Sequence, residues 1–301
     1  MTEQESKNVD EDIALLGQPE EAYEELAKHG YAVVSNVVPG VKCSKLVNVL
    51  NQLKRDRENA STVGHTESTI EERRFIEASG QVLLRDCLLD RPEVFLEFVD
   101  LPLVTMTLSR LFGEMAILDG FSASTTYQRD PRYCHPPKIH IDSRLAMSEI
   151  HNTTHLATMI CLEDFTESNG GIKIWPGSHR SGVVAHKDPH VKDRQCPGFV
   201  TLFPARGSLI FFLGQTWHQI GTSRTQQSRW GLLLTHARWW IKPQTNYTHC
   251  GEKMFSLCTT QQKVLLGFAS IVPDNRFIKS KTIIGADTIP DDYSDAQNGN
   301  N

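Results

Sequence analysis

From Ala116 onward, the chain alternates short apolar runs with turn residues, and this pattern constrains the fold more than any other feature of the sequence. Gly, Pro, Asn and Asp separate about eight runs of strand length, which are rich in β-branched and aromatic residues. The runs are residues 116–127, 138–142, 156–162, 172–175, 198–203, 208–213, 217–221 and 229–241. So many short strands predict an all-β core of the jelly-roll or a related barrel type.

Helices are predicted before this pattern, where they would cover one face of the sheet. The predicted helices are residues 19–29, 41–57, 92–99 and 101–112, with one strand at residues 31–38. Pro19 suits the first position of a helix, and Gly30 and Gly113 can close the helices that precede them. The sequence therefore predicts an all-β core with flanking helices.

One domain is expected. The chain has 301 residues, and barrels and sandwiches often run to about 200–250 residues as a single domain. Residues 1–17 and 287–301 are rich in Asp, Glu, Asn and Gln and lack apolar periodicity, so both are predicted to be disordered tails. The predicted domain is residues 18–286.

Charge and cysteine content exclude several classes of protein. The chain has 31 basic and 36 acidic residues, a net charge of −5, whereas proteins that bind nucleic acid usually carry a basic footprint. No apolar run approaches the roughly 20 residues that cross a bilayer, and the polar N-terminus lacks the pattern of a secretory signal. The seven cysteines are scattered without CxxC spacing, which disfavours a disulfide framework or a thiolate zinc site. We therefore expect a cytoplasmic protein, a monomer or a homodimer, that binds a small molecule and neither nucleic acid nor membrane.

Two strings in the predicted strands carry metal-binding side chains. His140 and Asp142 are two residues apart, so on a strand they point to the same face. His218 follows the apolar run 208–213 and could join them in a closed barrel. Two imidazoles and one carboxylate leave three positions of an octahedron open, which is typical of non-haem iron(II) oxygenases. A single His-x-Asp string is common, however, and alone it fits an ordinary core or surface histidine better.

Arg229 adds a cationic group after His218, on the next predicted strand. A guanidinium can bind a carboxylate bidentately and stays charged at any working pH. A buried Arg needs an acidic partner, and a dicarboxylate cosubstrate would supply one. The ordinary alternative is a surface cation or a protein salt bridge, which is what Arg206 and Arg224 are expected to be.

Several motifs follow one another in a fixed order along residues 115–245. They are His140-x-Asp142, Asn169-Gly170-Gly171, Trp175-Pro176-Gly177-Ser178-His179, Gly207-Ser208, His218 and Arg229, with Gly30-Tyr31-Ala32-Val33-Val34 upstream. Together they resemble the phytanoyl-CoA dioxygenase family, a branch of the iron(II)- and 2-oxoglutarate-dependent oxygenases. The resemblance implies a double-stranded β-helix (a jelly-roll, cupin-like fold) and an enzyme that oxidises a C–H bond of a small molecule while releasing succinate and CO2.

The resemblance also implies roles for individual residues. His140, Asp142 and His218 would bind iron(II), with 2-oxoglutarate and O2 as cosubstrates. Arg229 would bind the distal carboxylate of 2-oxoglutarate. The family often has a hydroxyl residue where this chain has Ile220, so Thr222 or Ser223 would substitute, or no hydroxyl is used. Further candidate contacts to the cosubstrate are Tyr127, Gln128 and Lys138.

The substrate is less constrained. An acyl-CoA would favour a dense basic patch, which the sequence lacks, so a secondary metabolite is favoured. Hydroxylation, desaturation, epoxidation and ring formation all remain open. Candidate pocket residues are Phe121, Arg144, Trp217 and Trp239, and Trp240, Gln244 and Asn246 could border the pocket. The turn that contains Pro176 and His179 is predicted to be structural.

Three rival interpretations stay open. His151 and His155 have the spacing of a helical zinc pair, but Thr153 and Thr154 weaken the helix and the Glu base of a zinc hydrolase is missing. A non-oxidative cupin-type isomerase or metal-binding protein is the second rival, although it would not need Arg229 as a carboxylate clamp. The third is an inactive relative that serves as a binding module.

Overall fold

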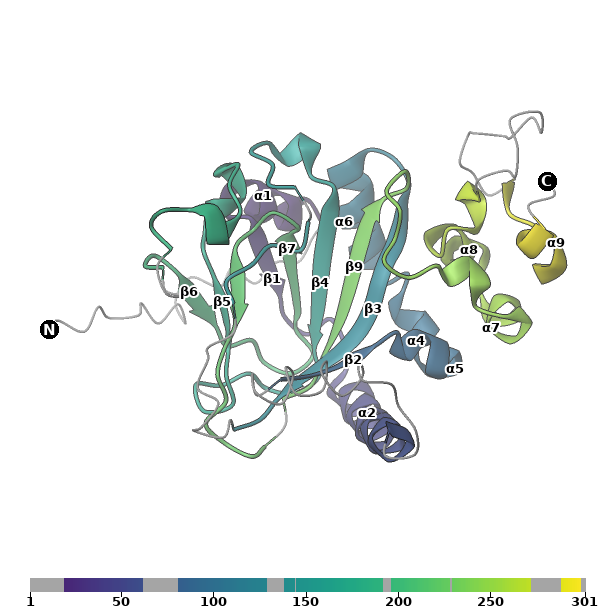
Figure 1. Ribbon diagram of the computed structural model, residues 1–301, viewed down its shortest axis with the longest axis horizontal. Helices are drawn as coiled ribbons and strands as arrows, with labels where there is room; N and C mark the ends of the chain where they lie inside the picture. The colour runs from purple at the N-terminus through teal and green to yellow at the C-terminus, as the bar shows by residue number, and fades with distance from the viewer. Residues whose placement is uncertain are drawn as a thin grey trace, which may run out of the picture.

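Two antiparallel sheets form the core of the protein. The structure is a computed structural model that describes residues 19–61, 81–128, 138–143, 145–191, 196–227, 229–271 and 288–298. The strands are β1 (Tyr31–Val34), β2 (Gln81–Arg85), β3 (Ala116–Thr126), β4 (His155–Cys161), β5 (Ile172–Ile174), β6 (Val200–Leu202), β7 (Leu209–Leu213), β8 (His218–Ile220) and β9 (Gly231–Arg238). Within these ranges, a six-stranded sheet has the order β1-β7-β4-β9-β3-β2 and a three-stranded sheet has the order β6-β5-β8 (Figure 1). The all-β core predicted from the sequence is confirmed.

The large sheet has apolar side chains on both faces. Its inner face, toward the small sheet, contributes Met159 and Phe212, which pack against Ile172 and Ile174 of β5. The opposite face contributes alternate residues such as Leu156 to a second core, which it shares with the helices. This two-sided burial follows from the alternation of side chains along each strand.

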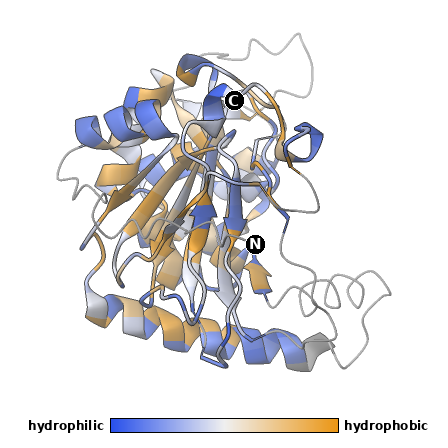
Figure 2. Ribbon diagram, turned by 90° about the vertical axis from the view of Figure 1, so that its left-hand side faces the viewer, coloured by the Kyte–Doolittle hydropathy of each residue, from blue (hydrophilic) through white to orange (hydrophobic). Residues whose placement is uncertain are grey.

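The helices cover that second face. They are α1 (Pro19–His29), α2 (Gly40–Ser61), α4 (Cys87–Asp90), α5 (Pro92–Phe95) and α6 (Pro102–Phe112), followed near the C-terminus by α7 (Glu252–Leu257), α8 (Thr260–Leu265) and α9 (Tyr293–Asn298). Leu46, Leu50 and Leu53 of α2 are buried, and Figure 2 shows α2 with both hydrophobic and hydrophilic surfaces. Helix α6 ends where predicted, at Gly113 with φ 64°. No helix in the described ranges has the length and apolar character that crossing a membrane requires.

A β-bulge at Asp119 interrupts β3. Leu118 pairs with His236 and Gly120 pairs with Thr235, so Asp119 is an extra residue without a partner of its own. The buried Asp119 carboxylate accepts hydrogen bonds from the Gln244 backbone N–H (2.9 Å) and the Gln244 side-chain amide (2.7 Å). The bulge therefore holds the segment that follows β9 against the start of β3.

The register across the sheet defines a line of inner-face residues. Phe212 of β7 pairs with Ala157 of β4, Ala157 pairs with Thr235 of β9, and Thr235 pairs with Gly120 of β3. We call these four residues the Phe212–Gly120 row. Among the described residues, an added Cβ at Gly120 would meet no atom within 4 Å other than those of its chain neighbours, so in this part of the structure the row ends beside open space.

Parts of the chain differ from the prediction. Residues 138–142 form no strand, and their pairing is limited to one bridge between His140 and His218. The predicted C-terminal tail, residues 287–301, includes α9, whose Ala296 is buried and whose Tyr293 hydroxyl accepts a hydrogen bond from the Gly251 N–H (2.8 Å). These packing contacts give order that its polar composition did not indicate. The other predicted tail, residues 1–17, lies outside the described residues.

Candidate metal centre

Three side chains that could bind a metal meet at the start of β8. The His140 N–H donates to the His218 carbonyl and the His218 N–H donates to the His140 carbonyl, both at 3.0 Å. The Asp142 N–H donates to the Gly214 carbonyl at 2.9 Å, which brings the His140-x-Asp142 string beside the turn between β7 and β8. The two segments that carry the predicted metal ligands are therefore adjacent. The segment with His140 and Asp142 is a loop joined to β8 by one bridge, rather than a strand.

The geometry of this triad suits a single metal ion. The ligand atoms of His140, Asp142 and His218 all lie within 4.8 Å of one another. The Asp142 Oδ1 atom lies 3.7 Å from the Nε2 atom of His140 and 3.5 Å from that of His218. Among the described residues, no other group of three or more His, Cys, Asp or Glu side chains meets this spacing, so His151 and His155 form no comparable site.

Backbone carbonyls orient both imidazoles. The Nδ1 atom of His140 lies 3.1 Å from the Lys138 carbonyl, and the Nδ1 atom of His218 lies 3.1 Å from the Thr216 carbonyl. A carbonyl only accepts, so each Nδ1 carries the proton and each Nε2 keeps a lone pair for a metal. Burial, and next the neighbouring His140, lower the pKa of His218 to about 4, against the opposing effect of Asp142. His218 is therefore neutral at pH 7, the form that binds metal.

Arg229 is buried between the sheets, with 1% of its surface exposed. Its Nε–H donates to the Thr126 hydroxyl (3.2 Å), and its guanidinium lies 3.9 Å from the centre of the Phe165 ring. Its Nη2 atom is buried without a hydrogen-bond partner in the described structure. Burial lowers the pKa of Arg229 to about 10, which leaves the side chain charged at neutral pH. A buried cation with an unused donor is a receptor for an anion.

The other candidate contacts to a cosubstrate lie on neighbouring loops. Ser223 forms a bridge with Gln128, and its hydroxyl donates to the Thr225 carbonyl (2.9 Å). Thr222, Gln128 and Lys138 are exposed, and Tyr127 is half-buried. Contact between these residues and the cosubstrate stays a prediction.

The predicted pocket residues divide into three groups. Phe121 is wrong as a pocket residue, because its ring packs on Phe95 (5.6 Å between centroids) in the helix-facing core. Trp217 packs with Ile139 near the triad and donates to the Val183 carbonyl (2.8 Å), and Trp239 donates to Glu114 (3.0 Å). Arg144 lies outside the described residues.

Two residues of this region were missed from the sequence. Thr126 orients Arg229, and Gly120 leaves open space on the metal side of the sheet. The row that ends at Gly120 begins at Phe212, whose ring lies 4.6 Å from the ring of His218. A glycine inside a strand pattern often marks a bulge or a close approach by a ligand, and this signal could have identified Gly120.

Known proteins resemble the chain in sequence and in fold. Dioxygenase trt7 of Aspergillus terreus is 28% identical over 116 residues, which is 38% of this chain and 38% of trt7. HygX from Streptomyces hygroscopicus, solved with nickel and 2-oxoglutarate bound, superposes with a TM-score of 0.56 at 12% identity, covering 76% of this chain and 90% of HygX. SnoK, a non-haem α-ketoglutarate-dependent carbocyclase from nogalamycin biosynthesis, superposes with a TM-score of 0.53 at 15% identity, covering 74% of this chain and 86% of SnoK.

The family assignment rests on a longer match. The family model described as phytanoyl-CoA dioxygenase matches residues 26–231. This range includes β1, the helices α2, α4, α5 and α6, and the triad His140, Asp142 and His218, and it ends with Arg229 and the start of β9. Since it covers more than half of the sequence, the chain belongs to the phytanoyl-CoA dioxygenase family.

Proposed function

We propose that the protein is an iron(II)- and 2-oxoglutarate-dependent dioxygenase that oxidises a C–H bond of a small molecule and releases succinate and CO2. The observation that carries the proposal is a pair of sites, one at the start of β8 and the other just before β9. One is a two-histidine, one-carboxylate triad, and the other is the buried Arg229 with an unused donor. A non-oxidative isomerase or a simple metal-binding protein would have no use for the second site.

The triad fits iron(II). Two imidazoles and one carboxylate are the facial donor set of non-haem iron oxygenases, and they leave positions for a bidentate cosubstrate and O2. When bound, iron(II) with 2-oxoglutarate and O2 supplies the oxidation of an unreactive C–H bond. The protein holds His218 neutral, and the backbone carbonyls beside the Nδ1 atoms of His140 and His218 leave both Nε2 atoms available to a metal ion.

Arg229 fits the distal carboxylate of 2-oxoglutarate. Its Nε–H is already directed by Thr126, and Nη2 is available for a carboxylate oxygen. In a buried site such a charge-assisted hydrogen bond is stronger than one in water, because the local dielectric constant is lower. We assign Thr222, Tyr127, Gln128 and Lys138 as further candidate contacts to the cosubstrate on the basis of the family resemblance.

The open space over Gly120 is proposed to hold part of the substrate. Gly120 and Phe212 lie on strands that are separated by three interstrand distances, which is roughly 14 Å measured across the strands of the sheet. A molecule that contacts Gly120 and also reaches the triad beside Phe212 would span on the order of 10 Å, by the same spacing. That length suits a multi-ring compound better than an amino acid.

The chemistry of this surface favours an uncharged substrate. The three side chains of the Phe212–Gly120 row carry no charge, and the hydroxyl of Thr235 is their one hydrogen-bonding group. Trp217 and Trp239 remain candidate pocket residues. The likeness to SnoK, an enzyme of nogalamycin biosynthesis, supports a secondary metabolite as the substrate. We place the enzyme in the cytoplasm as a monomer or a homodimer.

The test is an anaerobic titration of metal-free protein with iron(II) and 2-oxoglutarate, followed by absorption spectroscopy. A weak visible charge-transfer band is expected in the wild-type protein, and His218→Ala should abolish it. Admission of O2 should then produce succinate, measured by mass spectrometry. A folded protein that binds the metal but gives neither the band nor succinate would instead be a non-oxidative isomerase or a metal-binding protein.

A further inference from the structure

The turn between β7 and β8 supports two of the three residues of the metal triad, Asp142 and His218. The carbonyl of Gly214 accepts the N–H groups of Asp142 (2.9 Å) and Ser143 (2.8 Å). The carbonyl of Thr216 orients the imidazole of His218 (3.1 Å). Gln215 lies between these two carbonyls, so a displacement of this one residue would move the supports of Asp142 and His218 together.

A buried side-chain hydrogen bond fixes Gln215. Its amide Nε2 donates to the Thr153 hydroxyl at 2.8 Å, and both residues have at most 1% of their surface exposed. Thr153 lies at the end of the segment that leaves the triad after Ser143 and returns to the sheet at β4. The position of the turn therefore depends on where Thr153 is held.

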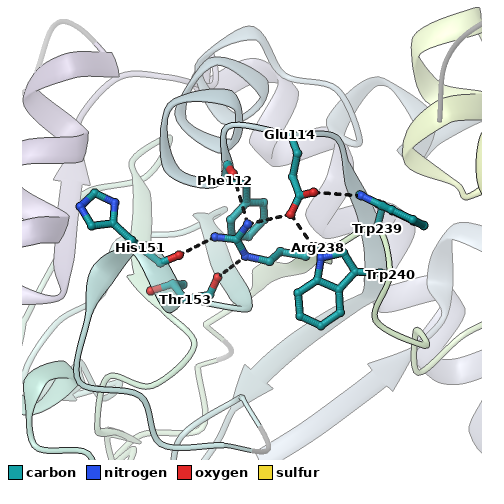
Figure 3. Close-up of polar contacts among 7 residues, drawn as sticks. All are labelled: Phe112, Glu114, His151, Thr153, Arg238, Trp239 and Trp240. Atoms are coloured by element: carbon teal, nitrogen blue, oxygen red, sulfur yellow. Dashed lines mark hydrogen bonds and ion pairs between the residues drawn. The ribbon is translucent and has the colours of Figure 1, made fainter. Parts of the chain in front are cut away.

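Arg238, at the end of β9, binds the backbone of Thr153 (Figure 3), whereas Gln215 binds its side chain. Its Nε–H donates to the Thr153 carbonyl (2.8 Å) and its Nη2 donates to the His151 carbonyl (2.7 Å). Its Nη1 donates to Glu114 (2.7 Å) and to the Phe112 carbonyl (3.2 Å). A planar guanidinium can satisfy these separate acceptors at once, whereas the single ammonium of a lysine cannot.

Glu114 fixes the orientation of Arg238. Its Oε1 accepts from Arg238 (2.7 Å) and from the indole of Trp240 (3.3 Å), and its Oε2 accepts from the indole of Trp239 (3.0 Å), as Figure 3 shows. The carboxylate thus has partners on both oxygens, and the side chain of Arg238 is 13% exposed. An ion pair with this many fixed partners is better defined than an ordinary surface pair.

We propose that Arg238 and Gln215 are positioning residues for the metal centre: Glu114 orients Arg238, Arg238 holds Thr153, and Thr153 holds the Gln215 turn that supports Asp142 and His218. The inference rests on the proposed metal site. None of these four supporting residues belongs to the triad His140, Asp142 and His218. They restrict the positions that Asp142 and His218 can take. This preorganisation raises the affinity of the site for a metal ion without adding a ligand.

Thr153→Val is the sharpest perturbation, because it keeps the shape of the side chain and removes only the hydroxyl that Gln215 binds. Arg238→Gln removes the guanidinium at the outer end of the same chain of contacts. Arg57→Gln is the matched control. Arg57 also joins a carboxylate (Asp90, 2.6 Å) and a backbone carbonyl (Arg85, 2.6 Å), but it lies on α2.

The experiment measures Ni(II) affinity of the full chain by isothermal titration calorimetry, with circular dichroism to verify folding. Thr153→Val and Arg238→Gln are each expected to raise the Kd for Ni(II) by about tenfold or more, since loss of a supporting residue typically costs 10–100-fold in metal affinity. Arg57→Gln should stay within about twofold of wild type, since an exposed ion pair contributes little. Digestion with thermolysin should cleave the segment around the exposed Leu145 faster in Arg238→Gln than in the control.

The outcomes separate this inference from the proposed function. If wild-type protein binds no Ni(II), the metal site itself is refuted, and the positioning role with it. If wild type binds Ni(II) and both folded variants bind it equally well, the metal site stands and the positioning role is refuted. If Arg238→Gln does not fold, Thr153→Val alone decides, because its substitution is isosteric.

Discussion

Replacing Arg229 by Met should weaken cosubstrate binding by about 30-fold or more while leaving the free protein about as stable as before. Met retains much of the apolar volume of the side chain and removes its charge. The variant loses the hydrogen bond to Thr126, worth about 1 kcal/mol, but no longer buries Nη2 without a partner, which costs about 1–3 kcal/mol. These two effects oppose each other, so the melting temperature without 2-oxoglutarate should change little.

The expected loss of affinity can be worked from the burial of the site. Removing one partner of a buried, hydrogen-bonded charge pair costs about 2–5 kcal/mol, or roughly 30-fold to 5,000-fold in Kd. At a 2-oxoglutarate concentration of 100 times the wild-type Kd, binding stabilises the wild-type protein by about 2.7 kcal/mol. A variant that binds 30-fold more weakly gains at most about 0.9 kcal/mol by the same relation.

Thermal unfolding with Ni(II), with and without 2-oxoglutarate, measures this difference. The wild-type melting temperature should rise by about 5–10 °C and that of Arg229→Met by less than about 4 °C, at about 2–4 °C for each kcal/mol. Arg224→Met is the control, because Arg224 lies in the same loop but is exposed and pairs with Glu167. A full ligand-induced shift in Arg229→Met would refute the assignment of Arg229 to the cosubstrate carboxylate.

Three further predictions follow from the same structure. His218→Ala should lose Ni(II) binding in calorimetry while its circular dichroism stays unchanged, and an unaltered Kd would contradict the triad. Burial lowers the pKa of His236 to about 4, so between pH 6.5 and 4 the unfolded chain binds a proton that the folded protein does not. Stability therefore falls as pH drops through this range, by about 2 kcal/mol at pH 5 from this residue, and His236→Leu should remove that share in urea unfolding at pH 7 and pH 5. Gly120→Leu should weaken binding of the uncharged fluorescent probe N-phenyl-1-naphthylamine severalfold with unchanged Ni(II) affinity, and equal probe binding would exclude the open space as a ligand site.

Local sequence signals predicted much of the fold. The helix at residues 19–29 and the end of α6 at Gly113 were predicted correctly, because a proline start and a glycine stop depend on neighbouring residues alone. The helices α7 and α8 were not predicted. Each has six residues, which is too short for an apolar period to stand out, and they are stabilised by packing on other elements.

The candidate site was only partly predictable. His140, Asp142, His218 and Arg229 carry unusual chemistry, and their order along the chain pointed to them. Thr126 carries an ordinary hydroxyl, and it becomes informative only when the fold brings Arg229 beside it. The supporting contacts of Arg238 likewise join residues that are distant in sequence, which no local pattern reveals.

The bulge at Asp119 decides which face of the sheet Phe121 occupies. In a regular strand, Leu118 and Phe121 would face opposite sides, since they are three residues apart. The extra residue allows both to face the helices and turns Gly120 toward the metal side. A one-residue irregularity of this kind leaves no clear mark in an apolar run.

The same bulge makes Asp119 a removable part of the strand. Without it, Leu118 and Gly120 would become neighbours and would keep the faces they have now, so pairing with β9 could close over the gap. What would be lost is the carboxylate that holds Gln244. The large sheet and the segment that Asp119 holds against it can therefore change independently, and insertion or deletion at this position is a route by which relatives could accept different molecules at an unchanged metal centre.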